Sequence, residues 1–502
     1  MTLPEAAPAA RLRTADEYRA SLRDGRRVFY RAEQVDDVTK HPAFSPAVEH
    51  AALDFEMSHD PQYAALALSE DGASRYFHVP RTDADLLARS ALIEASTRAG
   101  KTLVLLIREI GTDALLSLLA LSPRLGDPYA GRVQAFYEHC RNSDLALCVA
   151  QTDFKGDRSL PPSQQQNPDA YLRIVDRRDG GIVVRGAKLH TSVSINSNEM
   201  IVLPTRAMSE VDANYAVAFA IPIDTPGLTL VASPYLSTQG RNVAEHPLSA
   251  TRKMVETVTM FDDVFVPAER VFMDGQHELA GPLARGFVEF HRFTAISYKL
   301  PLVDALVGAA LLAARVNGLE KAGHVRDKLA WLICYAETLR ALTHHAAARA
   351  TVINDIAVPD TLLVNIAKLQ FAQGLHTAFM HVQDIAGGLL ATYPASEDLE
   401  HPVYGAALCR YLESAGSVAG GDRLKVLNMI SDLTTGDYGG YQAVLAIHAE
   451  GSIEAEKLTI VSQYDRARAI AYARWLACLE DGRWPPAAHE YATAQAGDAA
   501  EI

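Results

Sequence analysis

The sequence is organised around two runs, Asp144-Leu-Ala-Leu-Cys-Val-Ala-Gln-Thr-Asp-Phe-Lys-Gly-Asp-Arg-Ser159 and Gly180-Gly-Ile-Val-Val-Arg-Gly-Ala-Lys-Leu-His-Thr191. The first run begins as a short apolar strand and breaks into a polar loop at Gln151. The second is the far half of a hairpin, because Asp179-Gly-Gly181 is turn chemistry and the β-branched residues after it suit a pleated strand. A strand that ends in donors, acceptors and a fixed cation suits a polar, phosphate-bearing cofactor. A solvated loop between two strands explains the same residues, so the pattern alone leaves both interpretations open.

The composition is that of a globular protein. With 502 residues, 49% hydrophobic and 22% charged, the chain can form two to four domains or one cofactor enzyme of several layers. A net charge of −14 argues against nucleic acid or an anionic membrane as the main partner. The first ten residues lack the basic start and apolar core of a signal peptide. The five cysteines, which show no short paired spacing, are Cys140, Cys148, Cys334, Cys409 and Cys478. We therefore expect reduced thiols, no metal site and a soluble cytoplasmic protein.

The residue pattern divides the chain into three parts and a tail. Residues 1–144 predict a mainly helical N-terminal domain, in which Thr14-x-x-Glu17 is a capping box. Residues 145–276 contain short β-rich runs separated by Pro, Gly, Asn and Asp, which predict a central β domain of barrel or sandwich type. Residues 277–482 predict a four-helix bundle, and residues 483–502 a flexible tail. The helices expected in the bundle are Lys299–Asn317, His324–Asn354, Thr361–Gly387, Val403–Gly416, Arg423–Leu433 and one from Ile453 to Leu479.

Several motifs in a fixed order give the chain a family resemblance. They are Lys155-Gly-Asp-Arg-Ser159, Tyr171-Leu-Arg-Ile-Val175, the run from Gly181 to Lys188, Phe290-His-Arg-Phe-Thr-Ala-Ile-Ser-Tyr-Lys299 and Gly420-Gly-Asp-Arg423. On these motifs the chain resembles the 4-hydroxyphenylacetate 3-hydroxylase family, the oxygenase components of two-component FAD-dependent monooxygenases. The resemblance runs from about Arg13 to the helix before Gly482. It implies an α+β fold of the acyl-CoA dehydrogenase type, and Phe261-Asp-Asp-Val-Phe-Val-Pro267 also resembles a strand of those dehydrogenases.

The same resemblance implies an activity and its partners. Reduced FAD, supplied by a separate NAD(P)H-flavin reductase, would react with O₂ to a C4a-hydroperoxyflavin, which hydroxylates or oxidises a small organic substrate. The protein would shield that species from water and orient the substrate. A homodimer or homotetramer is expected.

The resemblance also implies which residues contact the cofactor. Lys155 and Arg158 can pair with a diphosphate, while Gln151, Thr152 and Thr191 offer groups that match the pyrimidine edge of a flavin. Thr191 is expected near the isoalloxazine ring. Asp153 suits a turn cap instead. The cofactor-binding set is therefore Gln151, Thr152, Lys155, Asp157, Arg158, Thr191, Gly451 and Ser452.

Gly451 and Ser452 belong to that set because Ile447-His-Ala-Glu-Gly-Ser452 resembles the C-terminal FAD contact of the family. Backbone N–H groups at the start of the following helix suit a phosphate, although a helix-capping turn explains the same residues. Arg292 and Thr191 are the candidate catalytic residues. Arg292 is expected to hold a phosphate or a substrate carboxylate, and an interdomain ion pair is the alternative.

Two departures from the family pattern concern the substrate. Phenol hydroxylases carry a histidine in the strand where this chain has Val149, which is therefore expected to line the substrate site. They also carry a Gly-Arg-Ser-Pro-Asp-Tyr stretch that is missing from the corresponding residues 99–113. Because phenol hydroxylation needs a group that takes or polarises the phenolic proton, the sequence predicts a substrate other than a simple phenol.

Three alternatives remain open at this stage. An acyl-CoA dehydrogenase-type enzyme needs a carboxylate base, which the sequence does not single out. The related 4-hydroxybutyryl-CoA dehydratase holds an iron–sulfur cluster with three Cys and one His. His291 matches that His, but Tyr298 stands seven residues later and residues 99–113 contain no Cys pair, so the cluster has no thiolate ligands. The third alternative is a non-catalytic flavin-binding scaffold.

Overall fold

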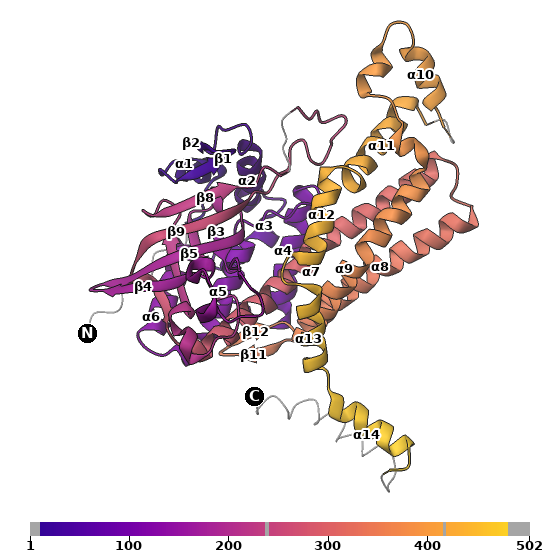
Figure 1. The fold of residues 1–502 in the computed structure, drawn as a ribbon. Coiled ribbons are helices and arrows are strands. Elements are labelled where there is room, and N and C mark those ends of the chain that lie inside the picture. Colours follow the sequence, from indigo (N-terminus) through magenta and orange to yellow (C-terminus); the bar gives the residue numbers. More distant parts are fainter. Residues whose placement is uncertain (1–10, 236–239, 415–417, 480–502) are drawn as a thin grey trace.

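Helices, strands and helices follow one another along the chain in the computed structural model, which describes residues 11–235, 240–414 and 418–479 (Figure 1). The predicted capping box is present at the first helix, where Thr14 Oγ1 accepts a hydrogen bond from the Glu17 backbone N–H. The expected tail at 483–502 lies outside the described residues. The helices of the N-terminal part are α1 (Ala15–Ser21), α2 (Ser45–His59), α3 (Ala64–Ala67), α4 (Asp83–Ala99), α5 (Glu109–Leu125) and α6 (Tyr129–Asn142).

Two sheets form the β part. One has six strands in the order β2-β1-β8-β9-β5-β4, and the other has four in the order β10-β7-β6-β3. Their bounds are β1 (Val28–Tyr30), β2 (Glu33–Val35), β3 (Leu147–Ala150), β4 (Arg173–Arg178), β5 (Gly181–Ser192), β6 (Glu199–Val202), β7 (Val217–Pro222), β8 (Leu228–Ala232), β9 (Glu256–Pro267) and β10 (Val271–Asp274). Strands β1 and β2 come from the N-terminal part of the chain. They join the larger sheet because Val28 pairs in parallel with Leu230 of β8.

Strand β5 has two breaks in its register with β9, the first of them between Val184 and Gly186. Its first residues pair antiparallel with β9, from Gly181 opposite Pro267 onward. The register then shifts between Lys188 and Thr191, where His190 adopts a φ of 55°. Such irregularities bend a strand and redirect its side chains, and they are common beside functional sites. The end of β5 is therefore the first local feature that marks a site.

The predicted helical bundle occupies the C-terminal part. Helices α7 (His277–Val316), α8 (Gly323–Ala348) and α9 (Thr361–Ala386) pack against one another, and α11 (Gly420–Thr434), α12 (Asp437–His448) and α13 (Ile453–Gln463) follow one another along α9 as a fourth column (Figure 1). Four predicted helices had wrong bounds. The helix expected from Lys299 is the second half of α7, which begins at His277. The helix expected to Asn354 ends at Ala348, because the chain turns into the hairpin of β11 (Thr351–Ile353) and β12 (Ile356–Val358).

The other two differences lie further along the chain. The helix expected from Val403 is shortened to α10 (Gly405–Leu412). The last expected helix is interrupted at Tyr464, and Asp465 caps a separate helix α14 (Arg466–Leu476) by accepting a hydrogen bond from the Arg468 backbone N–H. A side chain that competes for backbone donors in this way starts a new helix instead of continuing the old one.

Helix α7 is the longest helix of the bundle and contacts helices of both the N-terminal part and the bundle. It is long and apolar enough to cross a membrane by length and hydropathy, but 61% of its most apolar window is buried inside the protein. It packs against α4, α5, α8, α9 and α11. This environment is typical of the core helix of a bundle.

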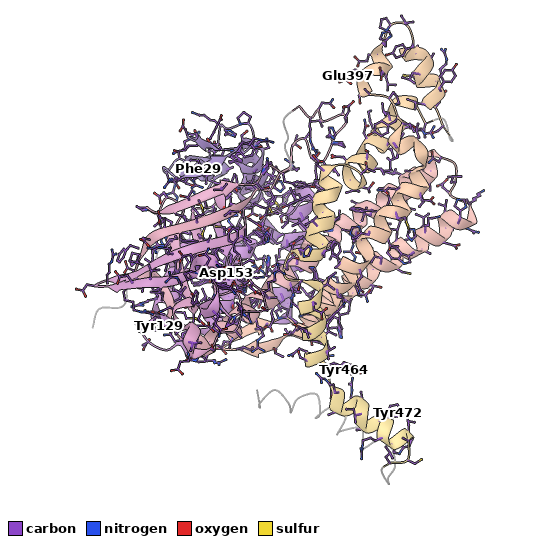
Figure 2. The ribbon with its side chains drawn as sticks, in the orientation of Figure 1. Phe29, Tyr129, Asp153, Glu397, Tyr464 and Tyr472 are labelled. Atoms are coloured by element: carbon purple, nitrogen blue, oxygen red, sulfur yellow. The ribbon has the colours of Figure 1, made fainter. Side chains whose placement is uncertain are left out.

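The C-terminal helices generate a prediction about assembly. Helix α14 projects from the rest of the molecule, and Tyr464 and Tyr472 mark this arm in Figure 2. Large apolar side chains on α13 and α14 are exposed, among them Leu458, Val461, Ile470 and Leu476. An exposed helix of this length is marginally stable in water, so we expect the arm to pack against a second copy in a dimer or tetramer.

Light scattering at micromolar concentration checks this expectation. The double variant Ile470→Glu/Leu476→Glu should shift the population toward smaller species, because charges would enter the contact. Val211→Glu, on an exposed apolar residue of the β part, is the matched control and should leave the assembly unchanged. A monomeric wild-type protein would contradict the prediction.

Candidate functional site

A buried ion pair joins the polar loop after β3 to strand β5. Lys188 Nζ lies 2.9 Å from Asp153 Oδ1, and each side chain is 2% exposed. The same ammonium donates to the Gln151 carbonyl at 2.8 Å and to the Leu203 carbonyl at 3.0 Å. Burial lowers the pKa of Lys188, and the Asp153 carboxylate opposes that shift. Asp153 (labelled in Figure 2) is therefore an internal ion-pair partner and not the turn cap that we predicted.

The loop beyond this pair carries cations that face one another. Lys155 is half-buried with a φ of 68°, and its pKa is lowered first by burial and next by the positive charge of Arg158, with Arg206 acting in the same direction and Asp153 opposing. Arg158 is exposed. Asp157 is also exposed and accepts hydrogen bonds from the backbone and hydroxyl of Ser159, at 2.9 and 2.7 Å. Mutual repulsion of this kind is relieved when an anion binds between the cations.

The end of β5 lies beside these cations. Burial lowers the pKa of His190, and the positive charges of Lys155 and His448 lower it further. Thr191 is fully buried, and its hydroxyl accepts a hydrogen bond from Thr259 Oγ1 at 3.0 Å. The Thr152 carbonyl accepts from the Leu189 backbone N–H at 2.7 Å. The polar loop, the end of β5 and the end of α12 therefore meet at one place.

The short connection between α12 and α13 forms the other side of that place. Glu450 and Gly451 have φ values of 58° and 113°. A Cβ on Gly451 would lie 2.6 Å from a terminal nitrogen of the Arg292 guanidinium, so glycine is required on two counts. Ser452 caps α13, since its hydroxyl accepts a hydrogen bond from the Ala455 backbone N–H at 3.3 Å. The capping role is thus present, and a phosphate contact at the same helix start stays a prediction.

Arg292 binds this connection through its guanidinium group. Its Nε donates to the Glu450 carbonyl at 3.1 Å, and another guanidinium nitrogen donates to Asn365 Oδ1 at 2.6 Å. The residue is 5% exposed, and burial lowers its pKa. These contacts give Arg292 a positioning role for Glu450 and Gly451. Binding of a substrate carboxylate by Arg292 stays a prediction.

Four further charged residues, which the sequence reading missed, surround Arg292. Lys299 Nζ lies 2.8 Å from Glu450 Oε2, and Lys368 Nζ lies 3.1 Å from Glu456 Oε1. Tyr298 donates its hydroxyl to Glu450. Burial raises the pKa of Glu450 well above its usual range and lowers that of Lys299 well below its own. Two lysines within apolar helical runs, Lys299 and Lys368, were the sequence signal for these buried ion pairs. Lysine is rarely buried without a partner of opposite charge.

A second buried group lies on the same helix. His291 Nδ1 lies 3.1 Å from Asp113 Oδ2, and Asp113 also accepts from Arg89 at 2.8 Å and from Thr294 at 2.9 Å. Phe287 stacks on the imidazole. A carboxylate that holds one ring nitrogen of histidine orients the other nitrogen for proton transfer. Sequence reasoning noted His291 and missed Asp113.

The residues around His291 and Tyr298 do not supply the thiolates that an iron–sulfur cluster needs. The His291 imidazole is held by Asp113, and Tyr298 is held by Glu450. Over residues 11–235, 240–414 and 418–479, no group of three or more His, Cys, Asp or Glu is arranged to hold a metal ion. Because such clusters need thiolate ligands, the residues present do not fit one.

The region of the missing phenol-binding motif is apolar or occupied by internal contacts. Val149 lies in β3 and is 3% exposed within the main core, and residues 103–107 are buried. The Arg108 guanidinium lies 2.6 Å from Asp144 and 3.1 Å from Asp54, with no exposed surface. The arginine of this region is therefore engaged in the interior. Nothing in these contacts replaces the histidine and tyrosine of the phenol hydroxylases.

Comparison with protein families decides the kinship. The N-terminal model of 4-hydroxyphenylacetate 3-hydroxylase matches residues 14–273, and the C-terminal model matches residues 280–478. The chain belongs to the 4-hydroxyphenylacetate 3-hydroxylase family. The resemblance inferred from the motifs is confirmed.

Two curated relatives with the same sequence identity to this chain are named for different reactions. A 4-hydroxybutyryl-CoA dehydratase/vinylacetyl-CoA-Δ-isomerase of Clostridium aminobutyricum is 30% identical over 475 residues, which cover 90% of this chain and 96% of that protein. The 4-hydroxyphenylacetate 3-monooxygenase oxygenase component of Thermus thermophilus is 30% identical over 438 residues, which cover 86% and 90%.

Solved structures agree with this kinship. The oxygenase component of 4-hydroxyphenylacetate 3-monooxygenase complexed with FAD has a TM-score of 0.85 at 27% identity, over 92% of this chain and 98% of that one. An archaeal 4-hydroxybutyryl-CoA dehydratase from N. maritimus has a TM-score of 0.87 at 28% identity, over 97% and 99%. Butyryl-CoA dehydrogenase from Megasphaera elsdenii, at 15% identity and a TM-score of 0.50, shares the fold. The α+β, acyl-CoA dehydrogenase-like fold is therefore confirmed.

The loop cations give the first prediction about the site. Arg158→Ala should weaken binding of reduced FAD by about 1–3 kcal/mol, the scale of one lost charge-assisted hydrogen bond. Anaerobic titration of the protein with reduced FAD measures this change. Arg178→Ala, which removes an exposed arginine at the turn between β4 and β5, is the control. Equal affinities of wild type and a folded Arg158→Ala variant would remove Arg158 from the site.

The connection at Gly451 gives a second prediction. Gly451→Ala should lower the free energy of unfolding by about 1–3 kcal/mol, because the backbone is strained for any other residue and the Arg292 guanidinium is held in place. Gly131 lies in α6, and a Cβ added there would meet open space. Gly131→Ala should therefore be neutral or stabilising by about 0.5–1 kcal/mol. Denaturant unfolding compares the two. Equal free energies of unfolding for Gly451→Ala and Gly131→Ala would show that the backbone at Gly451 accommodates a side chain.

Proposed function

We propose that this protein is the oxygenase component of a two-component, FADH₂-dependent monooxygenase, served by a separate NAD(P)H-flavin reductase. The observation that carries the proposal is the convergence of the loop cations, the end of β5 and the Gly451 connection at one place. The family membership supports it, since relatives named as oxygenase components share the whole architecture.

The residues fit a flavin dinucleotide by their charge. Arg158 and Arg206 each repel the Lys155 ammonium, and a diphosphate would neutralise that repulsion. Gln151 and Thr152 are half-buried beside them. When bound, reduced FAD supplies the electrons that activate O₂. The protein holds it, and Arg292 positions the Gly451 connection that closes one side of the site.

His291 is the candidate proton acceptor. Asp113 holds its Nδ1, so Nε2 is the nitrogen free to take a proton from a substrate. The dyad lies on α5 and α7, whereas the histidine of the phenol hydroxylases lies on the strand at the position of Val149. Because the strand position and residues 103–107 are apolar, the substrate would be a molecule with its own nucleophilic electrons, such as an amine, a thiol, an enolate or an electron-rich ring, rather than a simple phenol.

A second candidate function, flavin-dependent dehydrogenation, is favoured by one carboxyl group. Glu256 accepts hydrogen bonds from Ser192 at 2.7 Å and from Tyr441 at 2.9 Å, and burial raises its pKa. It lies beside Thr191, on the strand paired with β5. A dehydrogenase needs a carboxylate of this kind near the flavin.

Rapid mixing of the protein–reduced FAD complex with O₂ tests the proposal. An oxygenase should show a long-lived oxygenated-flavin absorbance before oxidised FAD appears. Direct conversion to oxidised FAD, together with anaerobic reduction of bound FAD by an acyl-CoA, would favour the dehydrogenase. Flavin binding without either reaction would favour a non-catalytic scaffold.

The substrate prediction is tested separately. With a supplied reductase, NADH and 4-hydroxyphenylacetate, most of the reduced flavin should end as hydrogen peroxide and little catechol should form. The reason is that an unpaired phenolate is costly to bury beside Val149 and residues 103–107. Product and peroxide are quantified together. Efficient, coupled catechol formation would prove the substrate prediction wrong.

A further inference from the structure

The connection between β8 and β9 is unusually long for two strands paired side by side. It runs over residues 233–255, and its described residues 233–235 and 240–255 form no helix or strand. Its contacts fix it against other parts of the molecule: Ser249 Oγ donates to Asp432 of α11 at 2.6 Å, and Lys101 Nζ donates to the Pro247 carbonyl at 2.7 Å. Long ordered connections in compact domains are usually functional.

Lys253 is the unexplained residue of this connection. Its side chain is 1% exposed, and its Nζ finds no hydrogen-bond partner among the described residues. The nearest aromatic ring, that of Phe44, has its centroid 6.0 Å from the Nζ. Burial and the positive charge of Arg241 lower the pKa of Lys253 to about 8. An ammonium buried in this way is costly, and in native proteins such a group usually has a functional reason.

The acidic residues of this region are already engaged. Asp437 pairs with Arg241. Asp432 accepts from the Leu248 and Ser249 backbone N–H groups at 2.8 and 2.9 Å, and it lies 3.8 Å from His246. These carboxylates leave Lys253 without a counter-charge. An anion from outside would complete its environment.

The neighbouring cation Arg252 also has a nitrogen without a hydrogen-bond partner. Arg252 Nε is buried without a partner among the described residues, and one terminal nitrogen donates to the Ala99 carbonyl at 3.5 Å. Burial lowers the pKa of Arg252, and Glu56 opposes that shift. Lys101 lies near enough for the Arg252 charge to lower its pKa. The segment before β9 thus carries two nitrogens, Lys253 Nζ and Arg252 Nε, that have no hydrogen-bond partner among the described residues.

Lys253 lies close to the candidate flavin site along the sheet. Glu256 pairs in register with Ser192, and the Val255 carbonyl accepts from the Val193 backbone N–H at 3.0 Å. Three residues of chain span at most about 10 Å, so the Lys253 backbone lies within that distance of Glu256. A small organic molecule with its reacting end near Thr191 is long enough to bridge such a distance.

We propose that Lys253, with Arg252 beside it, binds an anionic group of the organic substrate, either a carboxylate or a phosphate. The inference rests on the proposed function. It narrows the substrate class to molecules that carry a permanent negative charge away from the reacting atom. Uncharged analogues are rejected, because they leave a buried ammonium unpaired.

Thermal unfolding of the full chain with and without small anions tests the proposal. The probes are sodium phosphate and sodium phenylacetate, each compared with sodium chloride at equal ionic strength. The variants are Lys253→Met, Lys253→Arg and the control Lys425→Met, in which an exposed lysine is removed. Without anion, Lys253→Met should unfold at a higher temperature than wild type, because an apolar side chain replaces an unpaired charge.

The anion response then identifies the ligand. One of the two probes should raise the Tm of wild type and of Lys425→Met more than that of Lys253→Met, and Lys253→Arg should restore the response. A response to phosphate indicates a phosphate ester, and a response to phenylacetate indicates a carboxylate. A lower Tm of Lys253→Met without anion, or equal responses of Lys253→Met and wild type, would overturn the proposal.

The same variants separate this inference from the proposed function. Lys253→Met should bind reduced FAD and react with O₂ as wild type does, since the lysine contacts substrate and not cofactor. An oxygenated-flavin absorbance with no Lys253-dependent anion response refutes the anion site alone. A Lys253-dependent response without oxygen chemistry refutes the oxygenase and leaves the anion site standing.

Discussion

The ion pair between Lys188 and Asp153 fixes the place at which loop, sheet and bundle meet. Both partners are removed from water, so loss of either would leave an uncompensated charge at a cost of about 3–5 kcal/mol. The pair orients Gln151 through its carbonyl, and the loop leaves this anchor with Lys155 and Arg158 toward α12. Across the site, Arg292, Lys299 and Lys368 are balanced by Glu450, Glu456 and Glu289. The cations available to a polyanionic cofactor are therefore those of the loop, Lys155 and Arg158.

One scaffold in this family holds relatives named for oxygenation and for dehydration, so individual residues must decide the chemistry. In this chain His291 is bound by Asp113, Tyr298 stands where a thiolate would be needed, and Arg108 is enclosed by Asp54 and Asp144. Each of these residues is engaged within the protein. What remains for the substrate is an apolar region, an oriented imidazole and Lys253, whose Nζ has no hydrogen-bond partner in the part of the chain that the structure describes.

The sequence predicted what local patterns determine. The Thr14–Glu17 capping box, the β5 hairpin and the three-part order of helices and strands follow from turn chemistry and periodicity. It did not predict the pairing of β1 with β8, nor that Asp153 meets Lys188, because such contacts join residues far apart in the chain. The buried lysines at 299 and 368 were missed for the same reason, since their carboxylate partners lie on a later helix. Family motifs located the polar loop and Gly451, and no local pattern locates Lys253.

Helix α7 sets a limit on how the site can move. It carries the His291 dyad and, at the next residue, the Arg292 contact to Glu450, with about 100° of helical rotation between them. A buried helix packed on five others is a rigid spacer, so His291, the proposed proton acceptor, and the Gly451 connection, proposed to hold the cofactor, would keep a constant separation. Exclusion of bulk water must then come from segments outside the bundle.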